Sequence, residues 1–106
     1  MTTRTFTVTV SNPGSGNRYY IDGVLQATVD LAVQATYRFD QSDSSNTGHP
    51  LRLSATSDGT HNSGTEYTVG VTTVGTPGSS GAYTEIVVAE TAPQPLYYYC
   101  SVHSGM

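Results

Sequence analysis

Hydrophobic and polar residues alternate along most of this chain with a period of two, which is typical of half-buried β-strands. The first clear run places Phe6, Val8 and Val10 on one face and threonines on the other. The same criterion, together with turn-forming residues between the runs, predicts strands over residues 5–10, 19–22, 28–31, 36–39, 51–54, 67–74, 83–88 and 96–100. No stretch of ten or more residues shows a 3.6-residue period, so no helix longer than two turns is expected.

Seven or eight short strands separated by Gly- and Pro-containing turns predict an all-β sandwich with Greek-key connections. At 106 residues the chain has the length of one domain, expected to span residues 1–106. Charged residues make up only 11% of the chain, but β-branched and aromatic residues are abundant. This composition favours an ordered β-domain over a disordered segment.

Charge and cysteine content exclude several function classes. Four scattered arginines face eight acidic residues, so the net charge is −4 and no basic patch is available for nucleic acid. One cysteine excludes an internal disulfide. No apolar run approaches the ~20 residues that span a membrane, and the first residues lack the apolar core of a secretion signal. We find no motif for nucleophilic or phosphate chemistry and expect no enzymatic activity.

The candidate chemistry is concentrated after the last predicted strand, where Cys100, His103 and Met106 form a C-x-x-H-x-x-M motif. His49 lies far upstream, between a polar loop and a predicted strand. A thiolate, two imidazoles and a thioether are the donors of a mononuclear blue-copper site, with His₂Cys in a plane and a weak axial Met. Cys100 at the end of its strand can aim the three C-terminal donors at one point, and we expect His49, at the start of a strand on the facing sheet, to close the site from across the sandwich.

On this motif the sequence resembles the cupredoxins, the family of plastocyanin, amicyanin and pseudoazurin. The resemblance implies equatorial ligation of copper by His49, Cys100 and His103 and axial ligation by Met106. It also implies one-electron transfer with a redox protein and an extracytoplasmic compartment. The net charge of −4 favours a redox partner with a basic docking face, and we expect the isolated domain to be a monomer. Pro50 departs from the family, in which Asn often follows the first ligand histidine. The chain is also similar, more loosely, to cupredoxin-like modules within larger surface or phage virion proteins.

Other interpretations of the same residues remain open at this stage. Cys100 alone could be a small buried hydrophobe, or a catalytic thiol with His103 as its base, although no third orienting residue is evident. His61 is a competing upstream ligand within a turn-like segment, and Met106 is prone to fray as the last residue. Zinc is an adventitious substitute for copper. The alternative function is a structural or adhesive module in which the metal site serves stability or is vestigial.

Overall fold

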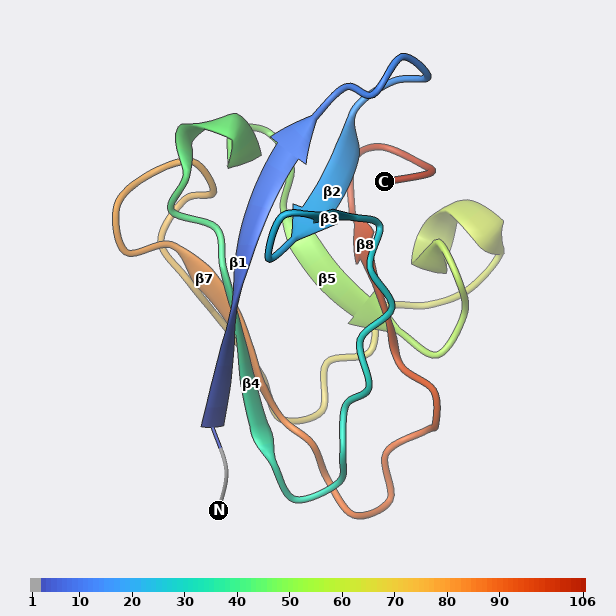
Figure 1. Cartoon of the computed structure of the whole chain (residues 1–106). Helices are drawn as coiled ribbons and strands as arrows, with labels where there is room; N and C mark the ends of the chain where they lie inside the picture. The colour runs from blue at the N-terminus through green and yellow to red at the C-terminus, as the bar shows by residue number, and fades with distance from the viewer. Residues whose placement is uncertain (1–2) are drawn as a thin grey trace.

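The computed structural model describes residues 3–106 and contains eight short strands and two 3₁₀ turns (Figure 1). The eight strands confirm the predicted all-β sandwich of seven to eight strands. In chain order the elements are β1 (Thr3–Ser11), β2 (Arg18–Ile21), β3 (Val24–Leu25), β4 (Thr36–Asp40), η1 (Ser44–Asn46), β5 (Leu51–Ser54), η2 (Gly59–Asn62), β6 (Val71–Val74), β7 (Tyr83–Val87) and β8 (Tyr97–Cys100).

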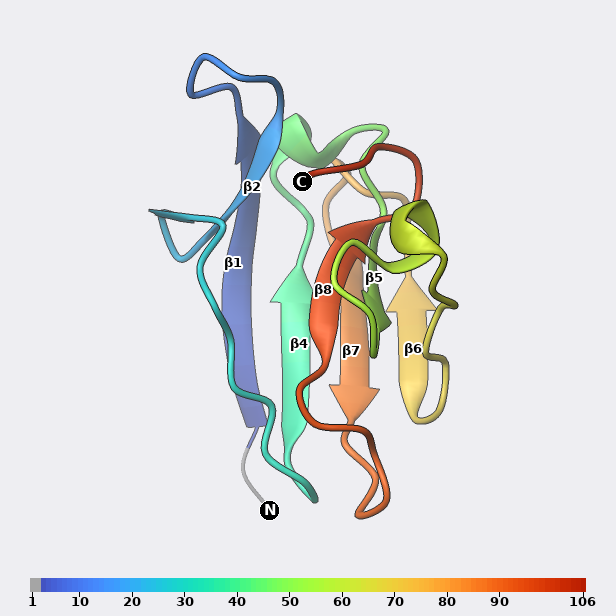
Figure 2. The ribbon, with the colours of Figure 1, turned by 90° about the vertical axis from the view of Figure 1, so that its right-hand side faces the viewer.

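The strands form two sheets of very different size. The larger sheet has the order β3-β2-β1-β4-β7-β6, in which β1 and β4 are parallel and the other neighbours antiparallel. The smaller sheet contains only β5 and β8, paired antiparallel. Figures 1 and 2 show this pair packed over one face of the larger sheet. The sandwich therefore depends on a two-stranded layer, which would be only marginally stable by itself.

The core follows the period-two pattern of the sequence. Phe6 and Val8 of β1 and Phe39 of β4 are almost completely buried, whereas the threonines of β1 face outward. The smaller sheet contributes alternate residues from both of its strands, namely Leu51, Leu53 and Cys100. Both inner faces are apolar, so burial of these side chains supplies the main force that holds the two layers together.

Helical structure in the described residues is limited to η1 and η2. Asp43 caps η1 by accepting a hydrogen bond from the Ser45 amide at 3.0 Å. Asp58 and Ser63 bracket η2 in the left-handed conformation, which keeps this element to a single turn. The expectation that no helix exceeds two turns is confirmed. Nothing helical between residues 3 and 106 has the length and apolar character that a membrane crossing requires.

The prediction of a strand over residues 28–31 is wrong, because these residues belong to no strand. Their side chains do alternate in burial, with Val29 partly buried and Leu31 fully buried between exposed Thr28 and Asp30. The pattern correctly indicated an extended half-buried segment, but within residues 3–106 its backbone pairs with no neighbouring strand. The two-residue strand β3 and the late start of β6 at Val71 are further differences from the predicted boundaries.

Two buried tyrosine hydroxyls join the layers. Tyr98 donates to the Ala27 carbonyl at 2.6 Å and Tyr19 donates to the His49 carbonyl at 2.6 Å. Burial raises the pKa of Tyr98 to about 12. Burial also raises the pKa of Tyr19, with a further contribution from the neighbouring Cys100. Both phenols therefore keep their protons in the folded protein at a pH where tyrosine in an unfolded chain ionises.

We expect folding stability to fall as the pH rises above about 10. There the unfolded state loses protons that the folded state retains, so alkaline pH favours unfolding. Denaturant midpoints measured between neutral pH and about pH 11 should decrease, and the decrease should be smaller in Tyr98→Phe. In a tyrosinate absorbance titration, two of the eight tyrosines should ionise only on unfolding. Ionisation of all eight in the native protein near pH 10 would contradict this prediction.

Candidate metal centre

The pairing of β5 with β8 brings two distant parts of the sequence to one end of the smaller sheet. Leu51 lies opposite Cys100, and the Ser101 amide donates to the Pro50 carbonyl at 3.1 Å. His49 lies two residues before β5, and the loop that carries His103 follows β8. The expectation that the strand after His49 lies on the facing sheet is wrong, because β5 pairs with β8 in the same sheet. The start of one antiparallel strand lies beside the end of its partner, so His49 and the C-terminal loop are neighbours despite a separation of 51 residues between His49 and Cys100.

His49, Cys100 and His103 converge at this end of the sheet. The Cys100 Sγ lies 3.9 Å from His49 Nδ1 and 3.6 Å from His103 Nδ1, and one donor atom of each residue lies within 4.8 Å of the others. Metal bonds of about 2.0–2.1 Å to imidazole nitrogen and about 2.3 Å to thiolate sulfur place those atoms about 3.6–3.8 Å apart in trigonal or tetrahedral geometry. The two sulfur–nitrogen distances are therefore close to those around a bound metal ion, and this group could hold one.

Burial differs across the three residues. Cys100 is completely buried and His49 is 8% exposed, whereas His103 lies on the surface. Burial lowers the pKa of His49, and the neighbouring His103 lowers it further. A lowered pKa keeps the imidazole neutral, which is the form that binds metals. The donor group thus has a protected interior side and one solvent-facing histidine.

Met106 is anchored rather than frayed. Its side chain is 6% exposed and belongs to the core cluster, and the Tyr19 amide donates to its carbonyl at 3.0 Å. The preceding Gly105 donates its amide to Asp58 Oδ1 at 2.9 Å and accepts from Gln26 Nε2 at 2.9 Å. These contacts keep the C-terminal residue in the fold, while the axial role of its sulfur remains a prediction.

A buried polar network fixes the backbone of His49. Its carbonyl accepts hydrogen bonds from the Tyr19 hydroxyl at 2.6 Å and from Gln41 Nε2 at 2.7 Å, and its amide donates to the Asn46 carbonyl at 2.8 Å. Gln41 also accepts from the Leu51 amide at 2.9 Å and donates to Asn46 Oδ1 at 3.1 Å. Both backbone groups of the candidate ligand are therefore held, which limits the positions that its ring can take.

Sequence reasoning did not find Tyr19, Gln41 or Asn46 as parts of the site. Gln41 and Asn46 fall in a run of polar residues that predicts only a loop. Yet Gln41 is 1% exposed and Asn46 is fully buried. The one signal available was that a loop leading into a ligand histidine needs internal hydrogen-bond partners. That signal does not say which polar residues provide them.

His61 lies near the site but supports the ligand strand from outside. Its Nε2 is 2.8 Å from the carbonyl oxygen of Cys100, and its ring packs edge-on against Tyr99. Gly59 packs on the same tyrosine so closely that a Cβ there would lie 2.6 Å from the ring, and its φ is +50°. The structure groups His49, and not the competing His61, with Cys100 and His103.

No protein-family model matches the chain, and neither the curated proteins nor the solved structures contain a match. The likeness to cupredoxins therefore rests on the β-rich fold and on the His-Cys-His group, which are compatible with a site of that type. What the site can do must be argued from its own donors and from the residues that hold them.

We expect Tyr19→Phe to weaken the site while preserving the fold. The change removes only the hydroxyl that donates to His49, so stability should fall by about 1 kcal/mol and metal affinity should decrease. Tyr20→Phe is the matched control, because the Tyr20 hydroxyl makes no hydrogen bond within the described part of the chain. Denaturant unfolding and metal titration of both variants test the prediction, and equal behaviour of the two would refute it.

Proposed function

We propose that the protein binds one copper ion through His49, Cys100 and His103, with Met106 as a weak fourth ligand, and that it carries single electrons. The observation that supports this proposal most directly is the approach of two imidazole nitrogens to one buried thiol, with all three donor atoms within 4.8 Å. Bound copper would supply one-electron chemistry by alternating between Cu(I) and Cu(II).

The donor set favours copper over other metals. Thiolate and thioether are soft ligands suited to copper, and imidazole also suits it, whereas a hard cation such as magnesium requires oxygen ligands. Within the described residues, the grouped donors include no carboxylate. Zinc accepts the same nitrogen and sulfur atoms, but its structural sites normally use four Cys or His ligands. Zinc is therefore the competitor that a metal titration must address.

The residues around the donors support electron transfer by holding them in place. The two hydrogen bonds to the His49 carbonyl and the His61 contact with the Cys100 carbonyl restrain both strand ends. Cys100 is itself enclosed in the core cluster. A ligand set that moves little when the charge of the centre changes needs little reorganisation, which favours fast electron exchange.

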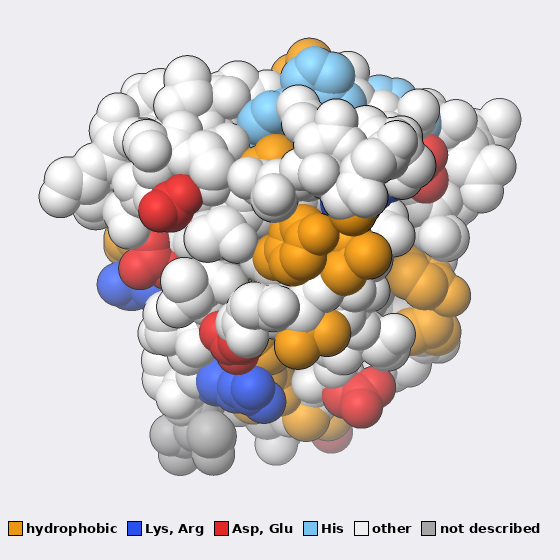
Figure 3. Space-filling model, turned by 45° about the horizontal axis from the view of Figure 1, so that its top comes forward, with side chains coloured by type: hydrophobic (Ala, Val, Ile, Leu, Met, Phe, Trp, Pro, Cys, Tyr) orange, Lys and Arg blue, Asp and Glu red, His pale blue; other side chains and the backbone are white. Residues whose placement is uncertain are grey.

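His103 is the natural contact point for a redox partner. It is exposed, and the adjacent Val102 is 58% exposed, so an imidazole edge and an apolar side chain share one surface. Figure 3 shows histidine side chains gathered at one end of the molecule. The net charge of −4 would favour a partner with a basic docking face. In this proposal the protein is a monomeric, non-enzymatic carrier that acts outside the cytoplasm.

We expect the wild-type protein to bind one equivalent of Cu(II) and to develop an intense thiolate-to-copper absorption band. Cys100→Ser should abolish the band because it removes the sulfur donor, and His49→Ala should strongly weaken binding. His61→Ala is the matched histidine control and should keep both the band and the stoichiometry. Visible absorption during copper titration, repeated with zinc present, provides the measurement.

A colourless wild-type protein would overturn copper ligation by Cys100. Retention of the band in His49→Ala with its loss in His61→Ala would assign the upstream ligand to His61. Thermal unfolding with and without metal adds an independent check, because a metal that binds only the folded state stabilises it.

If the function is electron transfer, the copper-loaded protein should show a reversible one-electron couple. Its exchange rate with a cationic redox protein should fall as salt screens the attraction between the two. Protein-film voltammetry and stopped-flow kinetics at several salt concentrations measure these two properties. A protein that binds copper and gains stability, but exchanges no electrons, would instead favour the structural module.

A further inference from the structure

Residues 27–31 have the burial pattern of a strand but lack strand partners. Ala27 and Val29 pack against the core cluster, Leu31 is buried, and Thr28 and Asp30 face outward. Within the described residues, none of the five backbone amides in this segment donates a hydrogen bond to the protein. The segment therefore presents extended backbone with unused donors.

The edge of β8 that faces away from β5 is also unpaired. The Ser101 amide donates to the Pro50 carbonyl, so these two residues form a hydrogen-bonded pair of the antiparallel ladder. Such pairs alternate with pairs that are not hydrogen-bonded to each other. Tyr99 and Tyr97 thus point their backbone groups toward β5. Tyr98 and Cys100 point theirs away, and the His61 contact with the Cys100 carbonyl agrees with this alternation. Tyr98 leaves both of its backbone groups on the open edge.

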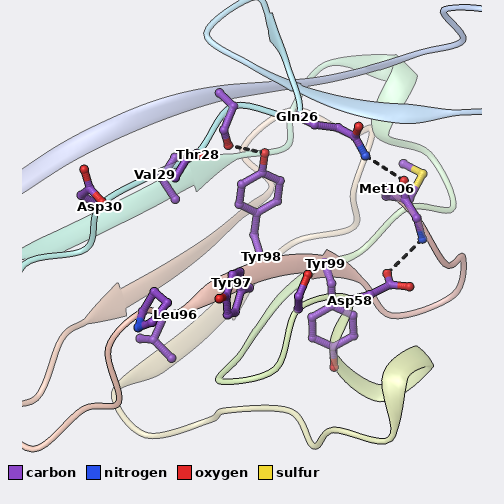
Figure 4. A pocket seen from close by; sticks show the side chains of 14 residues that line it. Gln26, Thr28, Val29, Asp30, Asp58, Leu96, Tyr97, Tyr98, Tyr99 and Met106 are labelled. Carbon is purple, nitrogen blue, oxygen red and sulfur yellow. Dashed lines mark hydrogen bonds between the residues drawn. The ribbon is translucent and has the colours of Figure 1, made fainter.

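A groove of about 420 Å³ separates these two backbones. Tyr98 lies across it, as Figure 4 shows, and its hydroxyl reaches the Ala27 carbonyl. The hydrogen bond at the end of this side chain joins the two walls of the groove, which are contributed by residues 27–30 and by β8. Gly105 also lines the groove and is bonded to Gln26 on one wall and to Asp58 on the other.

The charge and polarity of the lining restrict what can enter. The groove wall is mainly apolar and aromatic, with Val29, Leu96 and Tyr98 among its residues, and it contains two carboxylates, Asp30 and Asp58. No lysine or arginine lines it. A ligand with apolar groups and a positive charge would match this lining. Backbone-like donors and acceptors in the ligand would match the unpaired backbone groups of the two walls.

We propose that this groove binds an extended peptide segment of another protein, which adds a strand between residues 27–31 and β8 and carries a basic side chain beside Asp30. The guest backbone would pair with Tyr98 on one side and with the unused amides of residues 27–31 on the other. The smaller sheet would then continue from β5 through β8 and the guest to this segment. The groove lining does not include His49, Cys100 or His103, although it does include Met106, the proposed weak fourth ligand.

The probe is a capped peptide of about seven residues with lysine at both ends, alternating valine and threonine, and one tryptophan. The protein contains no tryptophan, so peptide fluorescence anisotropy reports binding directly. We expect saturable 1:1 binding, and amide hydrogen exchange should slow at Tyr98 and across residues 27–31. The same peptide N-methylated at alternate residues keeps its side chains but loses donors, and should bind at least about tenfold more weakly.

Asp30→Lys tests the charge requirement, since Asp30 is exposed and the substitution should leave the fold intact. The substitution should lower the affinity for the lysine-ended peptide about two- to fivefold and raise the affinity for a glutamate-ended version. Glu90→Lys is the matched control, with the same charge change at an exposed residue outside the groove. Absence of saturable binding, equal affinity for the N-methylated peptide, or protection of the same amides by self-association into a dimer would each overturn the proposal.

Discussion

The register of β5 against β8 is the constraint on which the rest of the molecule depends. Leu51 opposite Cys100 places the thiol on the core face of the smaller sheet, together with Leu53. A slip of one residue would put the sulfur and the leucines on opposite faces, so either the thiol or the leucines would leave the core. The same slip would move His49 away from the end of β8. Core packing and the metal-ligand geometry therefore select the same register, although they involve different atoms.

Two strands alone would not hold this register, and the structure supplies restraints on both sides. Thr84 of the larger sheet donates to the Leu51 carbonyl at 2.9 Å, and the Tyr67 amide donates to the Leu53 carbonyl at 2.7 Å. On the outer face, the turn that contains Gly59 packs against Tyr99. The outward carbonyls of Leu51 and Leu53 are thus used by other segments, which supports β5 within this two-stranded sheet.

Some strands and candidate ligands can be predicted from the sequence and other features cannot, for physical reasons. Alternation identified β1, β4, β5, β7 and β8 because burial of one sheet face determines every second residue. The motif around Cys100 drew attention to Cys100 and His103, which the structure groups with His49, because ligand chemistry restricts the residue types. Gln41 could not be recognised, since a buried glutamine and an exposed loop glutamine look the same in sequence. Residues 28–31 were misassigned because alternation reports burial on one side and contains no information about hydrogen-bonded neighbours.

The two ends of strand β8 differ in what covers their outer edge, and the alternation of its backbone explains why. Cys100 and Tyr98 both direct their side chains inward and their carbonyls toward the outer edge. At Cys100 that carbonyl is occupied by His61, so the edge is closed where the candidate ligands converge. At Tyr98 no equivalent residue covers the edge, and the groove begins there. A guest strand could therefore pair with the first half of β8 without displacing the contacts that hold the thiol. Both the contact that restrains Cys100 and the open edge at Tyr98 arise because every second residue of β8 directs its backbone groups away from β5.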